Sequence, residues 1–192
     1  MNTPAHAVLS LALLDRASEP TAARRTGAIL AGAILPDLPI FLFYGWQRLA
    51  LGTPDALIWT EVYFRPSWQA FFDAFNSLPL AAAGWALAHA AGLGRAAAFF
   101  AAMALHAVTD LPVHHDDAHR HFLPFSDWRW ASPVSYWDPQ HFGTLAAAGE
   151  ATLVAVASVL LWRRYRRGPA RAGLLTLNLL YLAAYAAFYL AR

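Results

Sequence analysis

Histidine is concentrated in one stretch of the chain, where five of the eight histidines fall within 16 consecutive residues. His106 and Asp110 are four residues apart, so on a helix they share one face, one turn apart. Pro112 ends or bends such a helix and can turn His114 or His115 back toward the same point. Imidazole with carboxylate suits zinc, manganese or iron better than calcium, which prefers oxygen ligands alone. The stretch therefore predicts part of a transition-metal site, and a solvated polar loop is the alternative.

Two residues far away in the sequence are candidates for the same site. Asp37 lies between Pro36 and Pro39 in an otherwise apolar segment. A carboxylate in a membrane span is costly unless it faces the interior of the bundle, so we interpret it as a ligand, with a helix N-cap or a kink as the alternative. His6 follows Pro4 among apolar residues, where a lone histidine is more often a satisfied core residue. The predicted metal ligands are His6, Asp37, His106, Asp110 and His114, and the predicted cofactor is a divalent transition metal, zinc before manganese or iron.

The composition is that of a membrane protein. Of the 192 residues, 58% are apolar and 14% are charged, whereas a soluble domain carries about a quarter charged residues. Cysteine is absent, which excludes disulfides and thiolate ligands. The net charge of +2 is too small to indicate nucleic-acid binding. Membrane lipid is the expected partner, and residues 1–192 are expected to form a single integral membrane domain.

The apolar segments predict an all-α polytopic bundle. A spanning helix needs roughly 20 mostly apolar residues, and the expected helices cover residues 27–44, 78–91, 96–108, 144–162 and 174–190. A shorter apolar helix is expected over residues 4–14. The chain is thus predicted to contain five to six membrane helices, with buried helices of a soluble protein as the alternative.

The arginines predict the direction of the bundle. Arg163, Arg164, Arg166, Arg167 and Arg171 lie between the last two expected helices, and positively charged loops stay cytoplasmic. Counting back through the helices places residues 45–77 and 109–143 on the extracytoplasmic side. The candidate metal ligands then share that side of what we expect to be a bacterial cytoplasmic (inner) membrane.

The second of these outer segments is predicted to be an ordered cap. Trp128, Trp130, Tyr136 and Trp137 suit a membrane interface, where amphipathic rings settle at head-group depth. Prolines at positions 124, 133 and 139 argue against a helix through the segment. We therefore expect an irregular extracytoplasmic loop cap over the ends of the helices.

At these residues the sequence resembles the bacterial membrane-bound metal-dependent hydrolases. The resemblance lies in residues 3–6 (TPAH), in residues 32–37 (GAILPD) and in the pair His106 and Asp110. Family members often have His-Ser-Leu before the third helix, whereas this chain has Asn-Ser-Leu at positions 76–78, and asparagine is a poorer metal ligand. A weaker similarity is to zinc-dependent phospholipase C. The resemblance implies metal-dependent hydrolysis.

The leading hypothesis is a hydrolase acting on a phospholipid or another lipid-linked phosphoester at the outer face of the membrane. The residues expected to serve as base, orienting group or additional ligand are Asp116, Asp117, His115 and Glu150. Arg120 and Arg129 are expected to hold an anionic head group, because guanidinium matches phosphate, and interfacial anchoring is the alternative. A non-catalytic membrane scaffold and a metal or proton transporter are the other hypotheses.

Overall fold

The computed structural model describes residues 1–15, 22–166 and 168–190. These residues form helices and irregular segments, without a strand. Among them, four helical stretches are long and apolar enough to cross a membrane: Arg25–Ala50, Gly94–Val113, Gly143–Arg164 and Gly168–Phe188. The expected all-α architecture with apolar spans is confirmed. Two further helices have 12 and 13 residues, below the minimum of about 17 for a span.

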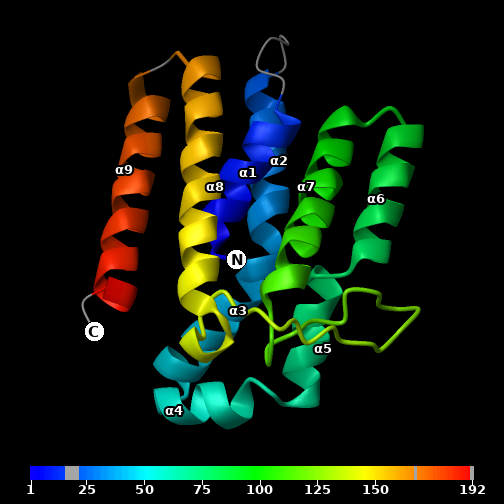
Figure 1. Cartoon of the computed structure of the whole chain (residues 1–192). Helices are drawn as coiled ribbons and strands as arrows, with labels where there is room; N and C mark the ends of the chain where they lie inside the picture. Colours follow the sequence, from blue (N-terminus) through cyan, green and yellow to red (C-terminus); the bar gives the residue numbers. More distant parts are fainter. Residues whose placement is uncertain (16–21, 167, 191–192) are drawn as a thin grey trace.

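Six helices run side by side along the length of the molecule (Figure 1). They are α1 (Thr3–Leu14), α2 (Ala22–Ile34), α6 (Leu78–Ala90), α7 (Gly94–Asp110), α8 (Gly143–Arg164) and α9 (Gly168–Tyr185). Helix α1 lies in the middle and contacts α2, α7 and α8, while α6 packs on α7 and α9 packs on α8. The first helix of the chain is therefore enclosed by later ones.

The second helix breaks where the two prolines predicted a break. Helix α2 gives way to a 3-10 turn over Leu35–Asp37, and α3 (Leu38–Gly45) then continues the chain. Pro36 and Pro39 have no amide hydrogen to donate, so the regular helical ladder is interrupted here. The interruption places Asp37 at the junction of α2 and α3.

Helices α2 and α7 approach each other closely just before that junction. A Cβ atom added at Gly32 would lie 2.0 Å from the carbonyl oxygen of Phe99, so only glycine permits this contact. Ala33 and Ala102, both buried, continue the same small-residue contact. The α2–α3 junction is thereby held beside the last turns of α7, where His106 and Asp110 lie.

Two short helices between α3 and α6 were not predicted from the sequence. They are α4 (Asp55–Leu57) and α5 (Pro66–Phe75), and they lie at the same end of the bundle as α3 (Figure 1). The segment from α3 to α5 packs around a buried cluster of Phe43, Ile58, Val62, Tyr63 and Phe72. The aromatic residues at positions 68, 71, 72 and 75 follow a helical spacing, which is the signal that identifies α5.

The segment between α7 and α8 is irregular and held by specific hydrogen bonds. The hydroxyl of Ser132 donates to the carbonyl of Pro112 over 2.6 Å, and the amide of Ser132 donates to the carbonyl of His114 over 2.9 Å. The amide of Tyr136 donates to the carbonyl of Val113 over 2.8 Å. Figure 1 places this segment beside α5, at the end of the bundle opposite the α8–α9 connection.

The arginine-rich end is tied together by Arg164. Its guanidinium donates to the carbonyl oxygens of Leu11 and Asp15 over 3.1 and 2.6 Å, which satisfies carbonyls that the end of α1 leaves without helical partners. The Asp15 carboxylate accepts hydrogen bonds from Thr26 and from Tyr165. Helices α1, α2 and α8 are thus joined at this end. Arg167, expected in the same positive loop, lies outside the described residues.

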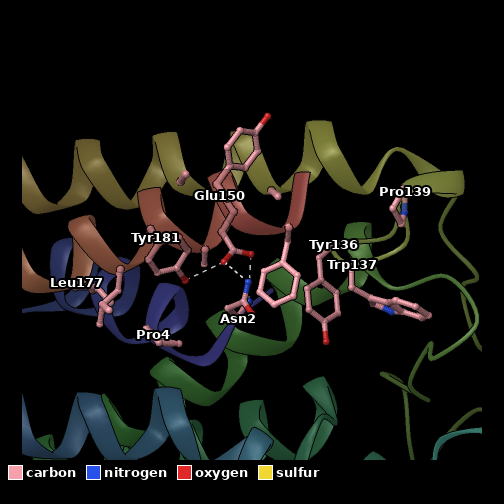
Figure 2. Close-up of a pocket in the computed structure, with 14 residues that line it drawn as sticks. Asn2, Pro4, Tyr136, Trp137, Pro139, Glu150, Leu177 and Tyr181 are labelled. Carbon is pink, nitrogen blue, oxygen red and sulfur yellow. Dashed lines mark hydrogen bonds between the residues drawn. The ribbon is translucent and has the colours of Figure 1, made fainter. Parts of the chain in front are cut away.

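An apolar cavity of about 450 Å³ lies between α8 and α9 (Figure 2). The start of the chain and residues 136–139 close its other sides. Glu150 points into it from α8 and Tyr181 from α9.

Candidate metal centre

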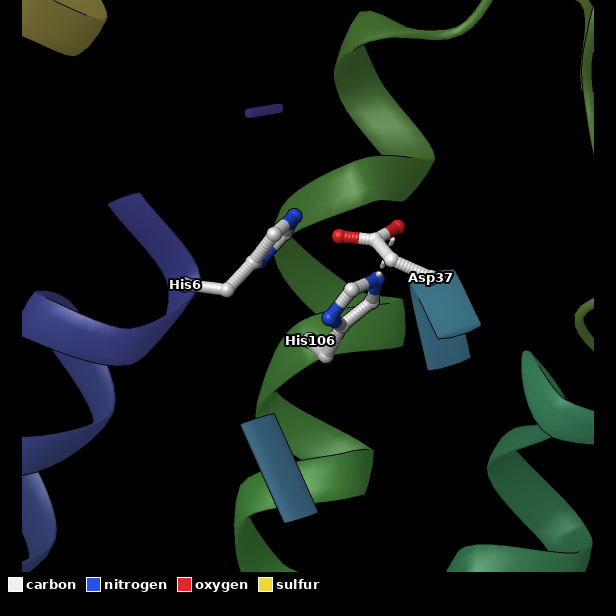
Figure 3. Close-up of side chains that lie close together, drawn as sticks. All are labelled: His6, Asp37 and His106. Atoms are coloured by element: carbon white, nitrogen blue, oxygen red, sulfur yellow. Dashed lines mark ion pairs between the residues drawn. The ribbon is translucent and has the colours of Figure 1, made fainter. Parts of the chain in front are cut away.

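Three residues from distant parts of the chain meet at one point. His6 in α1, Asp37 at the α2–α3 junction and His106 in α7 each offer one ligand atom, and these atoms lie within 4.8 Å of one another. Figure 3 shows both imidazole rings directed toward the carboxylate. The two histidines are buried and Asp37 is half-buried. The predicted convergence of these three residues is confirmed.

The hydrogen bond made by His106 assigns its tautomer. Its Nδ1 atom lies 2.8 Å from the carbonyl oxygen of Ala33, and a carbonyl only accepts, so Nδ1 carries the proton. Nε2 then faces the carboxylates, 3.5 Å from Asp37 and 3.0 Å from Asp110. A histidine ligand held by a backbone carbonyl through its other nitrogen is the usual arrangement at a metal.

The ring of His6 is oriented in the same way, with Nδ1 as the hydrogen-bond donor and Nε2 toward a carboxylate. Its Nδ1 atom lies 3.1 Å from the hydroxyl oxygen of Thr109, which itself lies 2.9 Å from the carbonyl of Leu105. The hydroxyl donates to the carbonyl and therefore accepts from Nδ1 of His6. The Nε2 lone pair of His6 faces Asp110 at 3.0 Å. The rings of His6 and His106 are stacked, with centroids 3.6 Å apart.

The donor set fits a transition-metal ion. The Nε2 atoms of His6 and His106 are fully buried, and neither makes a hydrogen bond with any described residue. Both nitrogens lie 3.0 Å from the Asp110 carboxylate, and an imidazole nitrogen beside a carboxylate is a ligand for zinc, manganese or iron once any proton on it has been displaced. Fold and site together define an apolar helix bundle with a candidate transition-metal centre near one end.

Asp37 is free for such a role because it does not cap a helix. It occupies the N-cap position of α3, but its side chain makes no capping hydrogen bond. One carboxylate oxygen faces His106, and the other accepts a hydrogen bond of 2.5 Å from the hydroxyl of Thr3. The side chain is 19% exposed, which leaves the group open on one side.

Asp110 connects the three residues to a second group. Its carboxylate is buried and lies 3.0 Å from both His6 and His106. It also lies 3.3 Å from Nε2 of His114 and forms an ion pair with the α-amino group of Met1. All five predicted metal ligands are thus neighbours in space, with Asp110 between the two groups.

Asp117 is the member of the predicted base group that reaches this cluster. Its carboxylate lies 2.9 Å from Nδ1 of His114, so it orients the ring with Nε2 toward Asp110. Burial would lower the pKa of His114, but the carboxylates of Asp110 and Asp117 outweigh this effect and raise it to about 9. A metal ion at this nitrogen has to displace a proton.

The structure does not bring His115 and Asp116 to the cluster. Nδ1 of His115 lies 2.6 Å from the carbonyl oxygen of Ser132, and its ring stacks on His141 with centroids 3.7 Å apart. Asp116 is exposed. In the sequence His114 and His115 are adjacent, as are Asp116 and Asp117. This arrangement did not show which residue of each pair faces the cluster.

Arg120 and Arg129 surround a buried carboxylate that was not predicted from the sequence. The guanidinium of Arg120 donates to Asp73 over 2.6 Å, and that of Arg129 donates over 2.7 and 3.1 Å. Burial would raise the pKa of Asp73, but the contacts with His119, Arg120 and Arg129 hold it well below its usual value. Both guanidinium groups thus already have a carboxylate partner within the protein. Their role in binding an anionic head group stays a prediction.

Glu150 holds the start of the chain instead of joining the cluster. Its carboxylate accepts hydrogen bonds from the amide and the side chain of Asn2, over 3.1 and 2.8 Å, and from the hydroxyl of Tyr181, over 2.9 Å. Arg129 pairs with Asp73 and not with Glu150. Glu150 therefore acts as a positioning residue for the segment that leads to Thr3 and His6.

The Asn-Ser-Leu stretch connects the cap to the bundle. Asn76 is buried, and its carbonyl oxygen lies 3.0 Å from Nδ1 of His121. Ser77 caps α6 by accepting from the amide of Leu80 over 3.2 Å. The amide of Leu78 donates to the carbonyl of His121 over 2.9 Å. These contacts give the stretch a structural role at the cap.

Comparison of the chain with protein-family models, with curated proteins and with solved structures finds no match. The case for a function therefore depends on the geometry of the site.

Proposed function

We propose that this protein is a metal-dependent hydrolase of the cytoplasmic membrane that acts on a phospholipid or another lipid-linked phosphoester. One observation carries the proposal: one imidazole nitrogen each of His6 and His106 and a carboxylate oxygen of Asp37 lie within 4.8 Å of one another. Asp110 and His114 extend this group, so that five predicted ligands are adjacent. Such a concentration of ligand atoms inside an apolar bundle is costly unless it serves a function.

The side chains have distinct tasks in this proposal. His6, Asp37, His106, Asp110 and His114 hold the metal. A bound divalent ion supplies a water of lowered pKa and polarises a phosphoryl oxygen. The carbonyl of Ala33 and the hydroxyl of Thr109 fix the two imidazole tautomers, and Asp117 orients His114. The opening beside half-buried Asp37 admits the substrate.

The position of the centre supports a lipid substrate. The group lies toward the end of the bundle that carries the irregular segment between α7 and α8, and the arginine-rich α8–α9 connection lies at the other end (Figure 1). Because positively charged loops favour the cytoplasmic side, the centre faces the extracytoplasmic leaflet. Phosphoesters of membrane lipids are the substrates that such a site meets first.

Metal content tests the proposal. Full-length protein purified in detergent is expected to retain a transition metal, zinc in the first instance, at stoichiometric level. The His106→Ala variant should lose both the metal and the hydrolysis of phospholipid in mixed micelles. His89→Ala is the matched control, because His89 is exposed on α6 and stacks on Trp85 outside the cluster. Wild-type protein without stoichiometric metal, or hydrolysis that survives His106→Ala, would contradict the proposal.

A further inference from the structure

The cavity between α8 and α9 adjoins the candidate metal centre through the first residues of the chain. Asn2 lines the cavity and is fixed by Glu150, which also lines it. The next residue, Thr3, donates to the Asp37 carboxylate. A second link is Tyr136, which lines the cavity and lies against the His114 ring with centroids 5.0 Å apart. One wall of the cavity is therefore made of residues that also contact the metal ligands.

The chemistry of the cavity suits hydrocarbon. Its one carboxylate is satisfied by neighbouring lining residues, because Asn2 and Tyr181 both donate to Glu150 (Figure 2). The remaining lining is largely alanine, leucine, proline and aromatic. The volume of about 450 Å³ lies within the range of roughly 300–1,000 Å³ typical of ligand pockets. No unpaired charge in the described lining calls for an ionic ligand.

The cavity is also accessible from the apolar phase. Both α8 and α9 are candidate membrane spans, so the groove between them faces lipid. Leu180 on α9 and Phe188, in the π-helical turn Ala186–Leu190 that follows α9, line the cavity and are more than half exposed. A lipid chain can thus enter sideways from the bilayer without crossing a polar layer.

We infer that this cavity binds one hydrocarbon chain of the lipid substrate, with the phosphoester head group directed toward the His6–Asp37–His106 group. The identity of the head group rests on the proposed function, whereas binding of the chain rests on the cavity alone. The cavity then sets the length and number of chains that a substrate can carry, and Glu150 fixes the wall between the chain and the metal.

Photolabelling tests the inference. Full-length protein is reconstituted in phosphatidylcholine vesicles containing phosphatidylglycerol with a diazirine in one acyl chain, and the adducts are mapped by mass spectrometry. We expect adducts on cavity residues such as Ala151, Leu177 and Tyr181. Ala151→Trp fills the cavity and should reduce these adducts about tenfold, because buried methylene contacts are lost. Leu153→Trp, exposed on the same helix, should leave them unchanged.

Competition and metal content separate the outcomes. Excess unlabelled phosphatidylglycerol should displace the cavity adducts better than diacylglycerol, which lacks the phosphate. If Ala151→Trp does not accumulate as monodisperse protein, Ala184→Trp fills the cavity from α9. Adducts spread over the exposed faces of both helices and insensitive to these variants would overturn the inference, even in protein that holds its metal. Cavity-specific adducts in protein without metal would support the cavity and contradict the hydrolase.

Discussion

Nδ1 of His106 lies 2.8 Å from the carbonyl oxygen of Ala33, and this contact joins the last turns of α7 to the end of α2, just before the turn that carries Asp37. The contact does two things at once. It orients the ring so that Nε2 faces the carboxylates, and it sets the distance between two predicted metal ligands. The close packing of α2 on α7 is therefore part of the site, and it can be tested independently of the ligands.

The first prediction concerns Gly32. A methyl group there would lie 2.0 Å from the carbonyl oxygen of Phe99, so Gly32→Ala forces α2 and α7 apart. We expect a loss of stability of about 1–3 kcal/mol and weaker metal retention, measured by thermal unfolding in detergent and by metal analysis. Gly27→Ala in the same helix is the control, because nothing lies within 4 Å of its added Cβ. Equal behaviour of the two variants would argue against a role for the close contact.

The second prediction concerns the group that orients His6. Thr109→Val removes the hydroxyl that accepts from Nδ1 of His6, so the ring is free to rotate or change tautomer. Loss of such a partner typically lowers metal affinity about 10- to 100-fold, which competition with a chelator measures. Thr152→Val is the matched control, because the hydroxyl of Thr152 donates only to the carbonyl of Ala148 on an exposed helix face. Unchanged affinity in Thr109→Val would mean that the hydroxyl does not hold His6.

The third prediction concerns the buried carboxylate of the cap. Asp73→Asn leaves Arg120 and Arg129 without their shared partner, and breaking a buried ion pair costs about 3–5 kcal/mol. Asp127→Asn removes an exposed partner of Arg120, 88% exposed, and should cost about 1 kcal/mol or less. The pKa of Asp73 is lowered from its ordinary 3.8. Its contribution to the free energy of unfolding is therefore fully present above that pH and is lost as the pH falls below it. Unfolding of both variants at neutral and acid pH checks the difference, which should shrink in acid.

The fourth prediction concerns pH and His121. Burial, and next the charge of His119, lower the pKa of His121 from 6.5 to about 4. The unfolded chain therefore binds a proton that the folded protein does not bind between these values, and this part of the stability is lost as the pH falls from 6.5 toward 4. We expect chelator-treated wild-type protein to lose stability across this window and His121→Gln to lose less. Identical pH profiles would exclude His121 as the source.

Much of the fold can be predicted from the sequence, because the patterns that determine it act within single helices. Long apolar segments must be helical in a membrane because every backbone polar group needs an internal partner. Because consecutive helices run in alternating directions, His6, Asp37 and His106 come to lie near one end of the bundle. The arginines predict which side of the membrane that end faces. Candidate ligands can be predicted for the same reason. The spacing of His106 and Asp110, like the prolines around Asp37, is a pattern that acts within one or two turns.

The partners of the remaining polar residues depend on contacts that no local pattern encodes. Arg120 and Arg129 lie in an irregular segment whose path is set by hydrogen bonds such as that from Ser132 to Pro112, so their pairing with Asp73 is a tertiary result. Glu150 meets Asn2 only because α1 packs beside α8. That same path turns His114 and Asp117 toward the cluster and His115 and Asp116 away from it.

The central claim is that two imidazoles and at least one carboxylate bind one transition-metal ion. X-ray absorption at the zinc edge of the purified full-length protein tests it most directly, because multiple scattering from imidazole rings counts the histidine ligands. We predict a first shell of nitrogen and oxygen with two or more imidazoles, reduced by one in His106→Ala and unchanged in His89→Ala. A protein without bound metal, or a metal shell without imidazole, would contradict the account.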